Sequence, residues 1–499
     1  MAQPVLIADA ARIDRSALVG LRRVAFLLST LLLAATATMV APLAIAIGYG
    51  EPQTVKSFAT TMFLGAAIGT VGYFLFHTDL AALTRHEGIA VVAIGWLMVC
   101  AIGSLPFVLD GVLNPLNAWF ETVSGFTGTG SSVIPDVEAL PRGILFWRCF
   151  THWLGALGFL VAFVALFPLL GLGAMQLYKA ESPGLEVDRL RPRLSSTARA
   201  LWIVYLILSV ALTLLLLAGG MGWYDALCQM FGAIGTGGYS TKNTSISWWH
   251  SPYIEWVILI FLWISSTNFS LWWAVLGGKP SRLLKDAEWR FYTAVLVASS
   301  LSIALLVYVT SSVSVHTSIR DAFFTVASLA STTGFVTADY EKWQPAAQYI
   351  LFLLLFMGGC AGSTAGAMKV IRVQLFAKQA VHEFHDTVHP YGVSTPRING
   401  KPITHTMMRS VSAFMGLYLL IYVISVSIVS LTGLDFATAL SGVATTMGGV
   451  GPGLAELGPY DNFLWVHPVA KIVFTFDMLA GRLELVTLFI MLTPAFWRR

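Results

Sequence analysis

The chain has 499 residues, of which 56% are hydrophobic and only 11% are charged, and its mean hydropathy is +0.74. Soluble domains carry about 25% charged residues, so this composition excludes a single soluble core and predicts a polytopic membrane protein. The formal net charge of +4 is too small and too dispersed to suggest a nucleic-acid partner. The four cysteines lie in or beside apolar runs, without the spacing of a metal site.

Ten apolar runs are long enough to cross a bilayer, which takes about 20 residues. In chain order they are 24–48, 57–76, 88–109, 144–170, 199–218, 253–276, 291–312, 349–376, 408–431 and 466–493. The links 171–198, 277–290 and 377–407 are rich in Lys and Arg, and the chain ends in two arginines. Because positively charged links stay on the cytoplasmic side, we expect these links and both termini to lie in the cytoplasm.

Between members of the last eight runs lie four apolar segments about half as long as a span. They are 117–126, 225–235, 321–331 and 438–446, and their first residues, Asn117, Asp225, Asp321 and Thr438, are types that favour a helix N-cap. In each case a glycine follows the first residue by thirteen positions, and these glycines are Gly130, Gly238, Gly334 and Gly451. The recurrence predicts four units of span, half-length helix, glycine tail and span, all running in the same direction.

Parallel repeats are related by an axis along the membrane normal, so the four glycine tails are expected to meet at one axis. A ten-residue helix is about 15 Å long, half the hydrocarbon thickness, so each tail would start near mid-membrane. Backbone carbonyls there can replace the hydration shell of a cation. The hydroxyls of Thr129, Thr236, Thr332 and Thr333 are additional candidate ligands. Four helix-hairpin connectors with flexible tips are the alternative interpretation.

The predicted fold class is therefore an all-α polytopic membrane protein with two N-terminal helices and four parallel repeats around a central pore. The predicted boundaries are 1–83 for the N-terminal segment, then 84–198, 199–290, 291–404 and 405–499 for the repeats. Arg148 and His152, at the start of the run that follows the first tail, are expected to pack against the half-length helices.

The sequence resembles the Trk/Ktr/HKT superfamily of cation transporters, specifically the Trk-type potassium-uptake membrane subunit. The resemblance covers essentially the whole chain. It rests on the four tails, the glycine-rich stretch 358–366, the sequence Gly481-Arg482-Leu483-Glu484 and the closing segment 492–498. It implies repeats of two membrane helices flanking a pore helix, in a potassium-channel-like pseudo-fourfold arrangement.

The same resemblance implies a potassium selectivity filter at the tails. Its potassium-binding residues would be Thr129, Gly130, Gly237, Gly238, Thr333, Gly334, Val450 and Gly451. Some sodium-selective relatives carry serine at the first filter glycine, and this chain keeps Gly130, which favours potassium. The second and fourth tails depart from a Thr-x-Gly pattern, so a sodium or poorly selective monovalent cation channel is the alternative function.

A glycine-rich stretch in the run 349–376 is the first gate candidate. Its glycines are Gly358, Gly359, Gly362 and Gly366. Helix-breaking glycines at membrane depth are tolerated only inside protein or along a cavity. The resemblance implies that this stretch is an intramembrane loop that obstructs the pore and moves on opening. Close packing of small residues between helices is the alternative.

Arg482, inside the last apolar run, is the second gate candidate. An arginine at membrane depth costs several kcal/mol unless it faces a cavity or a partner. The resemblance places an arginine here on the pore axis, where it repels cations or helps to hold the loop shut. The alternative is a structural ion pair with Glu484 or Asp477, or a side chain that reaches back to the membrane surface.

For partners, the resemblance implies a homodimer in the bacterial cytoplasmic (inner) membrane and a separate cytoplasmic nucleotide-binding regulatory subunit of the RCK type. No cofactor is expected, and K⁺ is the transported ion. The chain is not expected to be an enzyme. A lipid-modifying membrane enzyme is the alternative from another class of function. It would need His, Asp or Glu residues grouped at one membrane face, whereas Glu121 and the acidic residues of the loops opposite the basic links are dispersed among the repeats.

Overall fold

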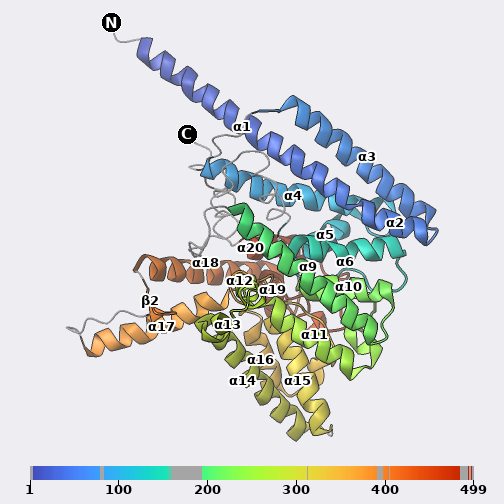
Figure 1. The fold of residues 1–499 in the computed structure, drawn as a ribbon, viewed down its shortest axis with the longest axis vertical. Helices are drawn as coiled ribbons and strands as arrows, with labels where there is room; N and C mark the ends of the chain where they lie inside the picture. Colours follow the sequence, from blue (N-terminus) through green and yellow to red (C-terminus); the bar gives the residue numbers. More distant parts are fainter. Residues whose placement is uncertain are drawn as a thin grey trace.

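The structure is a computed structural model that describes residues 4–78, 84–156, 158, 194–311, 313–389, 397–403, 405–483, 493 and 496. These residues are mostly helical, with one short hairpin of β1 (Arg397–Ile398) and β2 (Lys401–Pro402). Figure 1 shows the helices packed into one body, from which α17 (Val370–Val388) and the hairpin project. Within the described residues, six helices are long and apolar enough to cross a membrane, or seven if a bent pair counts as one span.

Three helices precede the first repeat-like unit. They are α1 (Pro4–Thr38), α2 (Val40–Gly48) and α3 (Pro52–Leu75). α1 and α3 lie side by side (Figure 1), because three glycines of α3, Gly65, Gly69 and Gly72, lie directly against side chains of α1. Small residues let membrane helices approach closely in this way. The candidate spans here, 20–48 and 52–75, agree with the two opening spans expected from the sequence.

Twelve of the other described helices follow one another in four groups of three, and α12 (Phe269–Leu276), α13 (Ser281–Lys285) and α17 lie between groups. The groups are α4 (Arg85–Leu109), α5 (Pro115–Thr127) and α6 (Arg142–Ala156); α9 (Leu194–Ala218), α10 (Trp223–Ile234) and α11 (Pro252–Ser265); α14 (Ala287–Thr310), α15 (Val315–Ala330) and α16 (Pro345–Leu354); and α18 (His405–Ser430), α19 (Phe436–Gly448) and α20 (Pro468–Arg482). In each group a first helix of 24 to 26 residues precedes a second helix of 12 to 16 residues. The second helices, α5, α10, α15 and α19, each end at a glycine-containing tail.

These four short helices begin earlier than the sequence predicted. Their N-caps are Asn114, Gly222, Ser314 and Asp435. The prediction of Asn117, Asp225, Asp321 and Thr438 as N-caps is therefore wrong. The physical reason is visible in α5 and α19, where the side chains of Asn114 and Asp435 accept hydrogen bonds from the backbone N–H groups of Asn117 and Thr438. Another capping residue lies one turn earlier and satisfies those groups first.

Two predicted spans are not continuous helices. The run 253–276 consists of α11 and α12 (Phe269–Leu276), which are bent by 104° relative to each other. The side chain of Asn268 caps α12 by accepting a hydrogen bond from the N–H of Ser270, so a new helix begins at that point. The run 349–376 is helical only in α16 and the start of α17, with a loop of 355–369 between them, which we call the α16–α17 loop.

The predicted spans 144–170 and 466–493 extend beyond the described helices. α6 and α20 have 15 residues each, and most of the remainder of both runs lies outside the described residues. The same holds for nearly all of the predicted link 171–198 and for Glu484. Ten spans were expected, and the described helices alone provide six, or seven with the bent pair.

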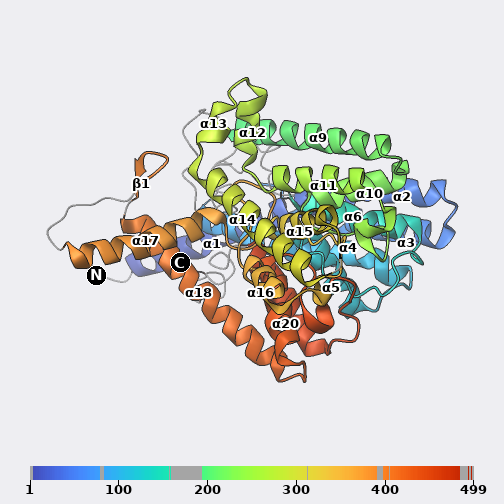
Figure 2. The same cartoon turned by 90° about the horizontal axis from the view of Figure 1, so that it is seen from below.

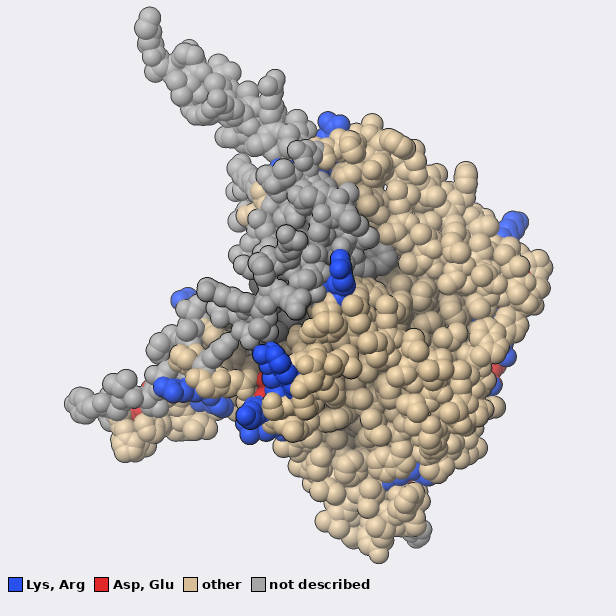
Figure 3. Space-filling view, in the orientation of Figure 1, with Lys and Arg blue, Asp and Glu red and all other residues tan. Residues whose placement is uncertain are grey.

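The surface is poor in charge over most of the face shown in Figure 3. Lys and Arg gather on that face near α13 (Ser281–Lys285) and α17, and Figure 2 shows α12 and α13 together at one edge of the body. Elsewhere, large apolar side chains are exposed, including Phe63, Phe74 and Leu305. Exposed apolar surface of this extent is characteristic of contact with lipid, and the basic cluster lies at the links 277–290 and 377–407.

Candidate ion-conduction site

The four tails share one backbone conformation. The last glycine of each tail lies in the left-handed region, with φ of 85° for Gly130, 78° for Gly238, 79° for Gly334 and 102° for Gly451. Two positions earlier, φ is again positive, at 73° for Gly128, 50° for Thr236, 57° for Thr332 and 66° for Gly449. The residue between them does not have a positive φ in any tail. This alternation turns successive peptide groups so that their carbonyls can face the same side.

Each of the last glycines lies directly against a carbonyl oxygen of the next tail in the chain. A Cβ atom on any of the four would overlap that oxygen or press against it. The facing pairs, glycine first, are Gly130 and Gly237, Gly238 and Thr333, Gly334 and Val450, and Gly451 and Thr129. The fourth tail thus contacts the first, and the four contacts form a closed cycle. The cycle contains all eight residues that the sequence predicted to bind potassium.

The threonine hydroxyls of the tails already have partners. Thr129 Oγ1 is 2.8 Å from Thr127 Oγ1, and Thr333 Oγ1 is 2.8 Å from Ser331 Oγ. Thr236 Oγ1 donates to the carbonyl of Gly235, its own neighbour in the chain, and Thr332 Oγ1 accepts from the N–H of Gly366. The carbonyl oxygens of the tails are therefore better placed than the hydroxyls to act as cation ligands.

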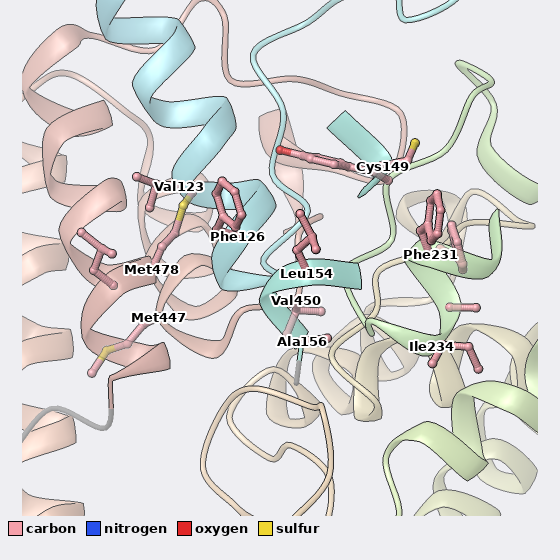
Figure 4. Packing of buried hydrophobic residues seen from close by; sticks show 14 of the residues in the cluster. Val123, Phe126, Cys149, Leu154, Ala156, Phe231, Ile234, Met447, Val450 and Met478 are labelled. Atoms are coloured by element: carbon pink, nitrogen blue, oxygen red, sulfur yellow. The ribbon is translucent and has the colours of Figure 1, made fainter. Parts of the chain in front are cut away.

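Apolar packing holds the tails in place. Figure 4 shows Phe126 of α5 and Ile234 of α10 in one cluster with Leu154 and Ala156 of α6 and with Val450 of the fourth tail. α6 approaches α5 so closely that a Cβ atom on Gly155 would overlap the carbonyl of Phe126. In the same way, Gly481 of α20 lies against the carbonyl of Met447 in α19.

A buried ion pair fastens α5 to α6 behind the first tail. Arg148 Nε donates to Glu121 Oε1 at 2.7 Å, and the two side chains are 4% and 0% exposed. Glu121 Oε2 also accepts from the N–H of Val133, and Arg148 Nη1 donates to the carbonyl of Ser240 after the second tail. The guanidinium lies 3.5 Å from the ring centre of Tyr239, so the pair connects the first two units. No residue near Glu121 in the sequence indicates this partner, which lies 27 positions away.

Replacing Glu121 with glutamine is expected to destabilise the protein by about 3–5 kcal/mol, because Arg148 would be left as a buried charge without its counter-ion. Thermal unfolding of the purified protein in detergent measures this change. Glu138→Gln is the matched control, since Glu138 pairs with Lys242 at 3.1 Å and is 38% exposed, and exposed pairs contribute about 0–1 kcal/mol. Equal changes in unfolding temperature for the two variants would contradict the prediction.

His152 lies in α6 and packs against the second tail. Its side chain is fully buried, and its ring centre is 4.0 Å from that of Tyr239. A Cβ atom on Gly237 would overlap the imidazole. The imidazole therefore supports the backbone of the tail itself, in addition to the packing of helices that the sequence predicted.

The α16–α17 loop contacts the ends of three of the short helices. The N–H of Gly366 donates to Thr332 Oγ1 at 2.7 Å, just after α15. A Cβ atom on Gly366 would lie 2.7 Å from the carbonyl oxygen of Gly448, the last residue of α19. Thr364 Oγ1 donates to the carbonyl of Ile234, the last residue of α10, at 3.2 Å. The glycines of this stretch pack closely, but as a loop and not as the interface of a continuous helix.

Arg482 at the end of α20 connects this loop to the first unit. Its Nη1 donates to the carbonyl of Thr364 at 3.1 Å. Its Nη2 donates to the carbonyls of Gly155 and Ala156 at 2.6 and 2.7 Å. These carbonyls belong to the last turn of α6, where the helix dipole favours a cation, and the carbonyl of Gly155 also accepts from the N–H of Gly158 at 3.0 Å. Asp477 instead accepts a hydrogen bond from Ser425, 2.7 Å away.

Acidic side chains gather beyond the third and fourth tails. Asp339 pairs with Lys342 at 3.0 Å, and Glu341 lies against Gly458, whose N–H donates to Asp461. Burial, with the nearby carboxylates of Asp461 and Asp339, raises the pKa of Glu341 to about 7. The negative charge of this group of acidic side chains therefore increases as pH rises through neutrality.

A family model, TrkH, described as a cation transport protein, matches residues 54–498. The chain belongs to the TrkH family. The "Trk system potassium uptake protein TrkH" of Escherichia coli strain K12 is 35% identical over 482 residues, covering 96% of this chain and 99% of the relative. The protein of the same name from Vibrio parahaemolyticus is 37% identical over 471 residues, covering 92% and 96%.

The fold is similar as well. The crystal structure of the potassium transporter TrkH from Vibrio parahaemolyticus matches with a TM-score of 0.86 and 34% identity, over 96% of this chain and 100% of that chain. The resemblance seen in the sequence is thus confirmed at the level of the TrkH family. Because this is a family of cation transport proteins, the alternative of a membrane enzyme is set aside.

Proposed function

We propose that this TrkH-family chain takes up potassium through a pore at the centre of the four tails. The closed cycle of glycine-to-carbonyl contacts carries the proposal, because it gathers carbonyls from Thr129, Gly237, Thr333 and Val450. Such carbonyls can replace the hydration shell of K⁺. The C-terminal ends of α5, α10, α15 and α19 add their negative dipole ends. The names of the relatives support potassium as the ion.

In this proposal the chain has two N-terminal membrane helices and four repeats, 84–198, 199–290, 291–404 and 405–499, with pseudo-fourfold symmetry about the pore. It lies in the bacterial inner membrane with both termini in the cytoplasm. The basic links 277–290 and 377–407 support this orientation. The filter ligands are the eight tail residues given above, and conduction through them is passive.

The gate consists of the α16–α17 loop, including Gly358, Gly359, Gly362 and Gly366, together with Arg482. Two observations support this assignment. The loop contacts the ends of three of the helices that would surround the pore, α10, α15 and α19. Arg482 joins the loop to α6, which belongs to the first group of helices. Glycines lower the cost of the backbone rearrangement that opening requires. We also propose a homodimer and a cytoplasmic RCK-type nucleotide-binding subunit that docks on the basic links and releases the gate.

Ion flux into proteoliposomes that contain the purified chain tests the function. Potassium is expected to enter faster than sodium, and Gly130→Ser is expected to reduce that preference, because a side chain at Gly130 would displace the carbonyl of Gly237. Empty liposomes give the background. Equal entry of potassium and sodium into liposomes with the parent protein would replace the potassium assignment with a poorly selective cation channel.

A further inference from the structure

Glu288, in the first turn of α14, holds both sides of the α16–α17 loop. Its side chain is buried, and its Oε1 accepts hydrogen bonds from the N–H of Ala361 at 2.7 Å and from the N–H of Ile371 at 3.1 Å. Ala361 lies in the glycine-rich stretch, and Ile371 lies in the first turn of α17. One carboxylate oxygen therefore joins the middle of the loop to the helix that follows it.

The chemistry of this contact favours the present loop conformation. A buried carboxylate is costly unless hydrogen bonds compensate for the lost water. The N–H of Ile371 in the first turn of α17, the N–H of Ala361 and the positive end of the α17 dipole provide that compensation. Movement of the loop away from Glu288 would forfeit the bond to Ala361.

The start of α14 is itself fixed from the surface. Asn399, at the tip of the β1–β2 hairpin, donates through Nδ2 to Asp286 Oδ2 at 2.8 Å and accepts from the N–H of Ala287 at 2.7 Å. Asp286 is the N-cap of α14 and accepts from the N–H of Trp289. Glu288 thus stands between an exposed hairpin and the buried loop, on a helix turn that is bonded to both.

We propose that Glu288 is a positioning residue that holds the α16–α17 loop in its obstructing conformation, through a fastening separate from Arg482. The inference rests on the proposed gate. Arg482 binds the loop at Thr364 and joins it to α6, whereas Glu288 binds it at Ala361 and joins it to α14. Glu288 acts through the loop backbone and does not touch the conducted ion.

Potassium flux into proteoliposomes of the full chain, with no partner added, tests the proposal. Glu288→Ala is expected to raise flux about tenfold, because loss of the acceptor of two buried hydrogen bonds weakens the closed state. Glu288→Gln keeps a carbonyl acceptor, so its potassium flux is expected to lie between that of Glu288→Ala and that of the parent. Glu255→Gln is the matched control, since Glu255 is equally buried but pairs with Arg320, away from the loop.

The rate at which a thiol reagent modifies Cys360 provides a second measurement. It reports release of the loop, whereas a general loss of stability would also expose the other cysteines. Cys360 precedes Ala361 in the loop and is 1% exposed, and the other cysteines, Cys100, Cys149 and Cys228, are fully buried in helices. In the Glu288 variants, a thiol reagent is expected to modify Cys360 faster, with the other three unchanged. Modification of all four cysteines would indicate unfolding and overturn the proposal.

Deletion of residues within 358–366 separates the two levels of inference. If the deletion raises potassium flux while Glu288→Ala and Glu288→Gln conduct like the parent and leave Cys360 protected, the gate stands and the role of Glu288 is refuted. If neither the deletion nor the parent carries potassium above empty liposomes, the proposed function itself fails, and the Glu288 inference falls with it.

Discussion

Replacing Gly334 with alanine is expected to lower potassium flux about a hundredfold. Two costs act together, since Gly334 has a φ of 79° and its added Cβ would overlap the carbonyl oxygen of Val450. A left-handed conformation costs an L-residue about 1–2 kcal/mol. With displacement of the carbonyl, a total near 3 kcal/mol in the conducting conformation corresponds to about a hundredfold in rate.

Flux into proteoliposomes, normalised to the amount of inserted protein, measures this effect. Gly416→Ala is the matched control, because Gly416 lies in α18 with open space around it and alanine is favourable within a helix. The control is expected to conduct like the parent. Parent-like flux in Gly334→Ala would mean that the third tail is not part of the conduction path.

Replacing Arg482 with alanine is expected to have the opposite effect and to raise flux about tenfold or more. Its guanidinium makes three hydrogen bonds to carbonyls of Thr364, Gly155 and Ala156, and these bonds hold the α16–α17 loop against α6. Net contributions of about 1.5–3 kcal/mol are typical for hydrogen bonds to charged groups, so their loss favours release of the loop. Removal of the positive charge also lowers the barrier to cations.

The same flux assay, with size-exclusion chromatography to confirm folding, measures the response to Arg482→Ala. Arg290→Ala, at an exposed position early in α14, removes the same charge from the surface and is expected to leave flux unchanged. A deletion within 358–366 is expected to match or exceed Arg482→Ala. Loss of the folded protein in Arg482→Ala, with no change in the deletion, would assign Arg482 a structural role and remove the loop as a gate.

Local sequence signals were sufficient for the parts of the fold that depend on local physics. The four short helices and the positions of their closing glycines follow from hydrophobic length and from the backbone freedom of glycine, and Gly130, Gly238, Gly334 and Gly451 all have positive φ. The predicted starts of the four short helices were wrong because they were placed by their thirteen-residue spacing to these glycines. Asn114 and Asp435 are equally good caps one turn earlier.

Long-range contacts had no such signal. Glu121 and Arg148 are 27 positions apart, and Glu288 and Ala361 are 73 positions apart, so nothing in either neighbourhood indicates the pairing. The bend between α11 and α12 had a local signal. The run 253–276 is long enough for one span, but it contains the polar stretch 265–268, and Asn268 at its end caps the second helix.

The cycle of tails also shows where the four tails must match and where they can differ. The residue that faces each glycine from the next tail is Thr, Gly, Thr or Val in the four units, and only its carbonyl oxygen, which every amino acid has, enters the contact. The side chain at this position can therefore differ between units, except that Gly237 has no room for one beside His152. The glycines cannot, since a change in one would require a compensating shift in its neighbour around the cycle. The four tails thus match in their main-chain geometry and not in their side chains.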